Sequence, residues 1–192
     1  PKNVGALTTM DLSTLEQQLT DDRPPFEQWQ PSLCGDIDIR IDREGRWFHE
    51  GSEIKRLPLV KLFARVLVKE GEDYFLMTPV EKMRIQVEET PFVMVDADLQ
   101  DSRGEKSQEP ESFWLFTSNL GHKVALGPQH PLELAAFNQQ LKPTIKVRDN
   151  IWATLHRNVY YRLIDQATEV PKGDSTSLVL HSQGNDYPLG DY

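Results

Sequence analysis

The sequence predicts an α+β protein built mainly of antiparallel β-strands, and three patterns carry this prediction. Between Asp36 and Asp42, polar residues alternate strictly with isoleucine, which is typical of a strand with one buried face. Residues 57–69 and 157–167 space their apolar residues as amphipathic helices do. Turn-forming residues separate further strand-like segments. The chain should therefore fold mostly as short strands.

The first expected element is a short helix near Leu15 and Leu19, where Ser13 and Glu16 have capping-box spacing. A tight turn at residues 43–45 should join the first two strands as a hairpin. Strands are expected at residues 36–42, 46–50, 74–78, 83–88, 92–98, 113–118, 122–126, 132–136, 145–148, 151–155 and 177–181. Residues 100–112 have no apolar anchor and should form an exposed loop.

The length of 192 residues allows two small domains. We expect an N-terminal α+β domain over residues 1–79, a C-terminal β domain over 80–170, and a loosely ordered tail over 171–192. Two segments share the order strand, tight turn, strand, helix: one carries Trp47 and His49, and the other carries Trp152 and His156. This order suggests an internal duplication, although a hairpin followed by a helix is also a common unit by chance.

Composition narrows the classes of function. The chain has 30 acidic and 21 basic residues and a formal net charge of -9, which disfavours binding to long nucleic acids. No apolar run reaches the roughly 18 residues of a membrane span, so we expect no membrane partner. Cys34 is the only cysteine, which excludes an intramolecular disulfide and fits a reducing compartment. We expect a cytoplasmic protein.

Positive charge is concentrated in two windows of this acidic chain. Residues 40–69 hold eight basic and four acidic residues, and residues 142–162 hold five basic and one acidic residue, so each window has a net charge of +4. If the two windows face each other, they would form a basic cleft that selects a small anion such as a phosphate or nucleotide. The alternative is that these charges lie on solvated faces of helices and hairpins.

Several familiar site motifs are absent from the sequence. It has no glycine-rich phosphate loop, so arginine side chains would have to hold a phosphate. The five histidines show no metal-ligand spacing, and Ile41 stands where a calcium loop beginning at Asp36 requires glycine. We therefore expect neither a metal nor a cofactor.

Polar and aromatic residues at the ends of predicted elements are the candidate ligand contacts. An indole and an imidazole on matching strands could stack on and hydrogen-bond a base, or could simply be partly buried at sheet ends. A proline-broken strand end at residues 78–82 combines a hydroxyl, an acid and an amine, as either a binding turn or a plain corner. The candidates are Arg40, Trp47, His49, Thr78, Glu81, Lys82, Arg148, His156 and Tyr160.

Several strings in the chain resemble, in the same order, the bacterial family designated domain of unknown function 1285. They are Gly35–Asp42, Gly45–Ser52, Thr78–Lys82, Pro91-Phe92, Asn119 with Gly121, Gly127 with His130-Pro131, Val147-Arg148 and Val159–Tyr161. The resemblance implies two domains with duplicated motifs, and a C-terminal domain like pleckstrin-homology domains, a partly open barrel closed by a helix. It also implies a nucleotide-like ligand at the domain junction and a role in signal transduction, including oxidative stress.

We therefore expect a non-enzymatic sensor or adaptor that binds a small anionic, nucleotide-like ligand at the domain interface. Arg40, Arg148 and Lys82 would hold the phosphates, Trp47 and His49 would contact the base, and Glu81 would orient the lysine or a ribose hydroxyl. One rival is a protein–protein adaptor that uses its pleckstrin-like domain. The other is a phosphoester hydrolase with His49 or Glu81 as general base.

Overall fold

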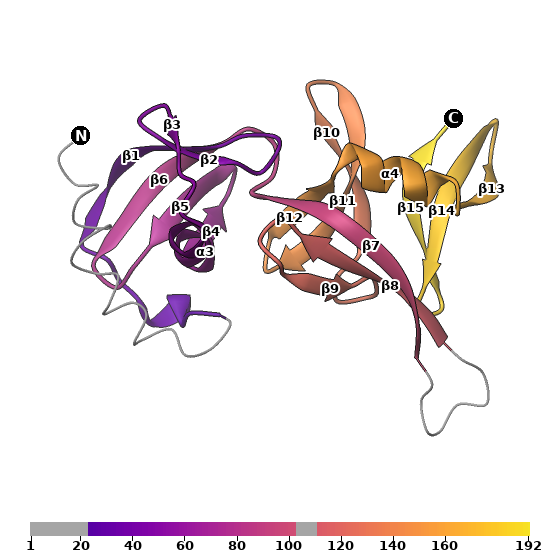
Figure 1. The fold of residues 1–192 in the computed structure, drawn as a ribbon, viewed down its shortest axis with the longest axis horizontal. Coiled ribbons are helices and arrows are strands. Elements are labelled where there is room, and N and C mark those ends of the chain that lie inside the picture. The colour runs from indigo at the N-terminus through magenta and orange to yellow at the C-terminus, as the bar shows by residue number, and fades with distance from the viewer. Residues whose placement is uncertain (1–22, 103–110) are drawn as a thin grey trace. The chain divides into compact units, whose positions relative to one another are not determined.

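The computed structural model describes residues 23–102 and 111–192, which divide into two compact units (Figure 1). The first unit ends at Glu88, and the second begins at Glu89. The turn Arg43–Gly45 lies within the first stretch of sequence but belongs to the second unit. The helix expected near Ser13 lies outside the described residues. Each unit is described by itself.

The first unit is a six-stranded sheet with helix α3 (Leu57–Arg65) packed on one face. A short 3-10 turn, η1 (Phe26–Gln28), precedes the sheet. In spatial order the strands are β3 (Ser52–Glu53), β2 (Trp47–His49), β1 (Leu33–Ile41), β6 (Glu81–Val87), β5 (Asp73–Met77) and β4 (Leu67–Glu70).

The isoleucine alternation has the predicted effect. Ile37, Ile39 and Ile41 are all buried on one face of β1. Trp47, which pairs with Ile41, stacks on Phe63 of α3 with ring centroids 6.1 Å apart. The helix expected over residues 57–69 ends at Arg65, because Leu67–Glu70 pair with β5 as a strand instead. Branched Val68, within this strand, favours the extended conformation.

The second unit contains another six-stranded sheet and helix α4 (Arg157–Ile164). Its spatial order is β10 (Leu132–Phe137), β11 (Gln140–Arg148), β12 (Ile151–Leu155), β7 (Phe92–Ser102), β8 (Glu111–Ser118) and β9 (Lys123–Ala125). A third sheet holds β13 (Thr168–Lys172), β14 (Ser175–Ser182) and β15 (Asn185–Asp191). The α+β class with mainly antiparallel strands is confirmed, and one sheet curls into a half-barrel.

The two six-stranded sheets share one topology. In each, the first and last strands are parallel neighbours at the centre, β1 with β6 and β7 with β12. Two further strands, paired antiparallel, extend outward on either side of this central pair. Both expected strand–turn–strand–helix segments form, but α3 follows the opening strands of its sheet and α4 follows the closing strand. The duplication therefore concerns the sheets, and the two segments occupy different places in them.

Three predicted boundaries are wrong. The first unit does not end at residue 79, because β6 lies at the centre of its sheet. Residues 100–112 do not form a loop throughout, because β7 continues to Ser102 and β8 starts at Glu111. The tail 171–192 is not loosely ordered, since most of it forms β14 and β15.

A buried serine joins this third sheet to the rest of the second unit. Ser182 is 0 % exposed, and its hydroxyl donates to the carbonyl of Leu126 at 2.6 Å. The same oxygen accepts from the Trp114 amide at 3.0 Å. Gln183 adds a side-chain bond to Leu126 and a backbone bond to Ser112. The C-terminal strands are therefore part of this unit's core.

We expect Ser182→Ala to lower the free energy of unfolding by about 1–3 kcal/mol, because the Trp114 amide loses a buried acceptor. Urea denaturation followed by circular dichroism measures the loss. Ser175→Ala is the matched control: this exposed hydroxyl donates to the Lys172 carbonyl in the same sheet, and its removal should cost less than about 0.5 kcal/mol. Equal effects of the two substitutions would contradict the assignment.

Candidate functional site

A cavity of about 420 Å³ lies within the second unit, between β11, the end of β12 and the first turns of α4. Its lining combines aromatic, cationic and apolar side chains. The lining residues are Arg43, Glu44, Glu89, Val93, Gln140, Leu141, Lys142, Pro143, Thr154, Leu155, His156, Arg157, Tyr160 and Tyr161. Two large lining side chains are open to solvent: Leu141 is 65 % exposed and Tyr161 is 53 % exposed.

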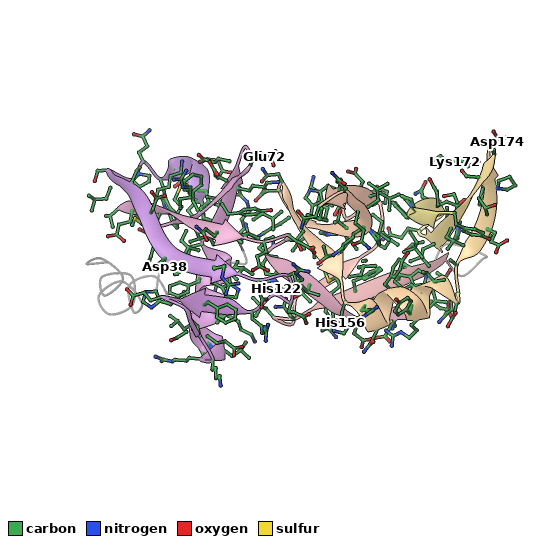
Figure 2. The ribbon with its side chains drawn as sticks, turned by 90° about the horizontal axis from the view of Figure 1, so that it is seen from above. Asp38, Glu72, His122, His156, Lys172 and Asp174 are labelled. Atoms are coloured by element: carbon green, nitrogen blue, oxygen red, sulfur yellow. The ribbon has the colours of Figure 1, made fainter. Side chains whose placement is uncertain are left out.

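Backbone pairing places His156 at the edge of this cavity. The His156 amide donates to the Met94 carbonyl at 2.8 Å and so continues the pairing of β12 with β7. His156 is also the N-cap of α4: its Nδ1 accepts from the Asn158 amide at 3.2 Å. With Nδ1 as acceptor, a neutral ring carries its proton on Nε2. His156 therefore offers one donor, the Nε2–H group, to its surroundings. Figure 2 labels His156 at the start of α4.

The first turns of α4 supply the aromatic and cationic groups. Tyr160 and Tyr161 have ring centroids 5.9 Å apart. Arg157 lies one turn before Tyr161, donates from Nε to its hydroxyl at 3.4 Å, and has its guanidinium 5.7 Å from the ring centre. The hydrogen bond with Tyr161 raises the pKa of Arg157 above its ordinary value. Arg157 thus presents a permanent positive charge beside an aromatic ring.

A second cation in the lining is neutralised by a carboxylate. Lys142 Nζ donates to both oxygens of Glu89, at 2.8 Å and 3.1 Å. The Glu89 side chain is only 9 % exposed, so this pair lies in the wall of the cavity. Removing either partner would leave a poorly solvated charge. The Lys142–Glu89 pair therefore shapes the cavity wall but adds no net charge to it.

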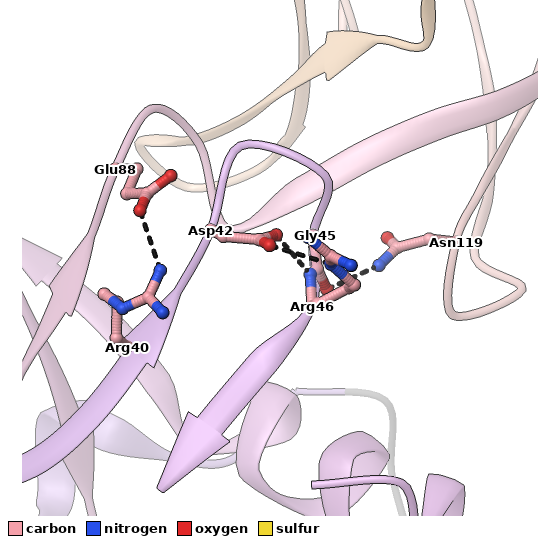
Figure 3. A network of polar contacts seen from close by, with 6 residues as sticks. All are labelled: Arg40, Asp42, Gly45, Arg46, Glu88 and Asn119. Carbon is pink, nitrogen blue, oxygen red and sulfur yellow. Dashed lines mark hydrogen bonds and ion pairs between the residues drawn. The ribbon is translucent and has the colours of Figure 1, made fainter. Parts of the chain in front are cut away.

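The turn between β1 and β2 lines the cavity through Arg43 and Glu44. It is closed by Asp42, whose carboxylate accepts from the Arg46 amide at 2.9 Å and Arg46 Nε at 2.8 Å (Figure 3). Gly45 has φ +80° and accepts at its carbonyl from Asn119 Nδ2 at 3.1 Å. A Cβ at this position would lie 2.6 Å from that nitrogen, so only glycine fits.

Of the nine predicted site residues, only His156 and Tyr160 line this cavity. Arg148, also in the second unit, lies at the end of β11, with Nη1 3.8 Å from Asp149. The sequence prediction overlooked Arg157 and Tyr161 as site residues. Their spacing of four residues on a predicted helix was the available signal.

The other six predicted residues lie in the first unit, and their surroundings differ from the predicted roles. Trp47 is 1 % exposed in the core, so stacking on a base does not fit its position. The Thr78 hydroxyl accepts from the Glu81 amide at 3.0 Å, and both residues are buried in a turn. His49 Nε2 lies 3.8 Å from the neighbouring carboxylate of Glu50.

The two predicted phosphate-binding cations of the first unit have carboxylate partners. Arg40 Nη1 donates to Glu88 at 2.7 Å (Figure 3), and its guanidinium lies 4.4 Å from the Phe48 ring centre. Lys82 pairs with Glu70 and lies 4.6 Å from the Phe75 ring centre. A phosphate would have to compete with these acids.

The described residues contain neither a metal-ligating cluster nor a membrane-spanning helix. Over residues 23–102 and 111–192, no cluster of three or more histidine, cysteine, aspartate or glutamate side chains could hold a metal ion. Within the same ranges, no helix has both the length and the apolar character needed to cross a bilayer.

Comparison with known proteins identifies the family. Residues 24–90 match the model "Domain of unknown function (DUF1285), N-terminal domain", and residues 91–189 match "Protein of unknown function (DUF1285), C-terminal domain". The chain belongs to the DUF1285 family. The family boundary at residues 90 and 91 agrees with the division of the structure at Glu88 to within a few residues.

Two crystal structures of DUF1285 family proteins are similar to this chain. The one from Silicibacter pomeroyi DSS-3 has 32 % sequence identity and a TM-score of 0.76, with 93 % of each chain covered. The one from Shewanella baltica OS155 has 25 % identity and a TM-score of 0.51, covering 67 % of this chain and 91 % of its own. No protein with a curated description matches.

The cap of α4 gives a test of the site's geometry in this DUF1285 protein. We expect His156→Ala to lower the free energy of unfolding by about 0.5–2 kcal/mol, because the Asn158 amide loses its acceptor. His156→Asn retains a capping oxygen and should stay within about 0.5 kcal/mol of the parent. Chemical denaturation measures both, and a loss of the same size in the two variants would show that the cap is not the cause.

Proposed function

We propose that this DUF1285 protein is a non-enzymatic binding protein for a small anionic, nucleotide-like ligand, held in the cavity of its second unit. The observation that carries the proposal is the combination of Arg157, Tyr160 and Tyr161 on one helix beside a cavity of about 420 Å³. Ligand pockets of roughly 300–1,000 Å³ typically combine apolar and aromatic walls with a few polar groups.

The aromatic part of the ligand would contact the tyrosine pair. Tyr161 is half-exposed, with the Arg157 guanidinium over its ring at 5.7 Å from the centroid and the ring of its neighbour Tyr160 at 5.9 Å. A planar base gains more from such a surface than an inorganic anion of the same charge, because ring contacts add to apolar burial. The exposed side chain of Leu141, on β11, adds a further apolar surface for the base.

The anionic part would contact the start of α4. Arg157 has a neutral hydroxyl as its hydrogen-bond partner, and no acid within residues 23–102 and 111–192 forms an ion pair with it, so a phosphate would not have to displace one of these acids. A guanidinium can hold two phosphate oxygens at once. His156 Nε2 supplies a further donor at the same end of the helix. Arg40 and Lys82 are left out of the proposal because Glu88 and Glu70 already pair with them.

Signal transduction follows as the wider role within this proposal. A ligand held between β11 and α4 would contact both elements at once. It would therefore favour one position of α4 relative to β11. A binding event becomes a signal when the ligand prefers one arrangement over another. The proposal involves no chemical step on the ligand.

Thermal unfolding against nucleotides, cyclic nucleotides and dinucleotides tests the proposal, with sulfate and pyrophosphate as charge controls. At a ligand concentration 100 times its dissociation constant, stabilisation is about 2.7 kcal/mol. For a protein of this size the midpoint should rise by about 5–10 °C. A rise with a nucleotide but not with pyrophosphate supports the proposal, and no rise with any compound overturns it.

Two variants on α4 then locate the site. Arg157→Gln should weaken the binding of the active nucleotide about tenfold or more, because a charge-assisted bond to phosphate is lost. Arg162→Gln is the matched control: Arg162 lies on the same helix, pairs with Asp96 at 2.7 Å, and is not in the cavity lining. Isothermal titration calorimetry measures both constants. Unchanged binding by Arg157→Gln would move the site elsewhere.

A further inference from the structure

The first unit carries a concentrated basic surface that the proposed ligand site does not use. From residue 54 to residue 69 the chain has five basic residues and no acidic one, in a protein of net charge -9. Lys55, Arg56 and Lys61 are exposed, just before and within α3, and we call these three residues the α3 basic face. Its charge is not needed by the cavity, which lies in the other unit.

The cations of this face differ from the other cations of the first unit. Arg40, Arg46, Lys82 and Arg84 each form an ion pair, with Glu88, Asp42, Glu70 and Asp36 in turn. Among the residues that the structure describes, Lys55, Arg56 and Lys61 have no such carboxylate. Their charge therefore remains available to an external anionic group.

The stability of α3 does not explain these cations. Arg56 is the N-cap, no side chain caps this end, and the first turn contains no acid. Positive side chains near a helix N-terminus oppose the helix dipole. The sequence thus holds cations at a place where aspartate or serine would stabilise the helix better.

An exposed apolar residue lies among the charges. Leu57, the first residue of α3, is 49 % exposed and directly follows Lys55 and Arg56. Exposed Pro58 comes next. Acids bound this stretch on both sides along the chain, with Glu50 and Glu53 before it and Glu70, Glu72 and Asp73 after it. The uninterrupted run of positive charge is therefore short, which suits a short acidic segment better than a long polyanion.

We propose that the α3 basic face binds a short acidic peptide segment of a partner protein, with an apolar side chain of that segment against Leu57. Charge complementarity attracts the segment, and the apolar contact fixes its register. This interaction is independent of the nucleotide-like ligand, since the two surfaces share no residue.

Fluorescence anisotropy with a short labelled peptide, rich in glutamate and carrying one leucine, tests the proposal on the full chain. The peptide should bind the parent and lose affinity as salt rises, and its glutamine counterpart should not bind. Lys55→Glu/Arg56→Glu should weaken binding about tenfold or more. The same change should leave the thermal midpoint equal or higher, because acids suit this end of a helix.

The control variant Lys123→Glu/Lys172→Glu changes the net charge equally on exposed residues of the second unit and should keep the parent affinity. Equal weakening by both double variants would reduce the effect to net charge and overturn the proposal. Binding of vesicles of anionic phospholipid without binding of the peptide would also overturn it. A third outcome would also overturn the proposal: the peptide does not bind, and the parent instead forms a concentration-dependent dimer that Lys55→Glu/Arg56→Glu loses. Nucleotide stabilisation should be the same in all these variants.

Discussion

Parallel pairing between the first and last strands of each six-stranded sheet is the constraint on which the structure depends. In the second unit, the register of β12 on β7 carries through to the bond between the His156 amide and the Met94 carbonyl. That bond fixes where α4 starts, and the start of α4 sets the positions of Arg157, Tyr160 and Tyr161 beside β11. The cavity walls formed by β11, the end of β12 and α4 follow one another along the chain, and the pairing of β12 with β7 fixes their place in the sheet.

The same pairing decides the electrostatics of the first unit. Arg40 and Glu88, and likewise Asp36 and Arg84, are 48 residues apart in the chain but are joined across β1 and β6. A net charge of +4 counted over residues 40–69 therefore overstates the field of those residues, since distant acids neutralise part of it. The α3 basic face keeps its charge because Lys61 lies in helix α3 and Lys55 and Arg56 lie just before it. None of the three takes part in the ion pairs between β1 and β6.

The sequence patterns predicted those elements that short stretches of neighbouring residues determine. The isoleucine alternation located β1, the turn at residues 43–45 located the hairpin, and the extents of β12 and the start of α4 follow from short stretches of sequence. His156 and Tyr160 were found because both lie in that stretch. The first unit's end was predicted wrongly, because Pro79 between β5 and β6 resembles a domain boundary, and the parallel partner that places β6 at the centre of the sheet, β1, is far away in the chain. The role of Arg157 also depends on the first residues of β11, which begins at Gln140, whereas the predicted strand covered only residues 145–148.

Of the third sheet only the strand at residues 177–181, within β14, was predicted, and the other two strands were missed for a different reason. The strands of this sheet are rich in serine and threonine, and few apolar residues such as Val179, Leu180 and Leu189 are buried. Its contact with β8 depends instead on hydrogen bonds of a fully buried serine, and a polar residue in a core position looks like a surface residue in the sequence.

The position of Ser182 in the chain has a consequence for protein synthesis. Its hydroxyl satisfies backbone groups of Trp114 and Leu126, which leave the ribosome long before it. Until residue 182 has emerged, the nascent second unit holds these two groups without their final partner and cannot complete its core. A chain truncated in β13 or β14 therefore lacks this serine, and its second unit keeps unsatisfied core groups that make it a substrate for chaperones and proteases.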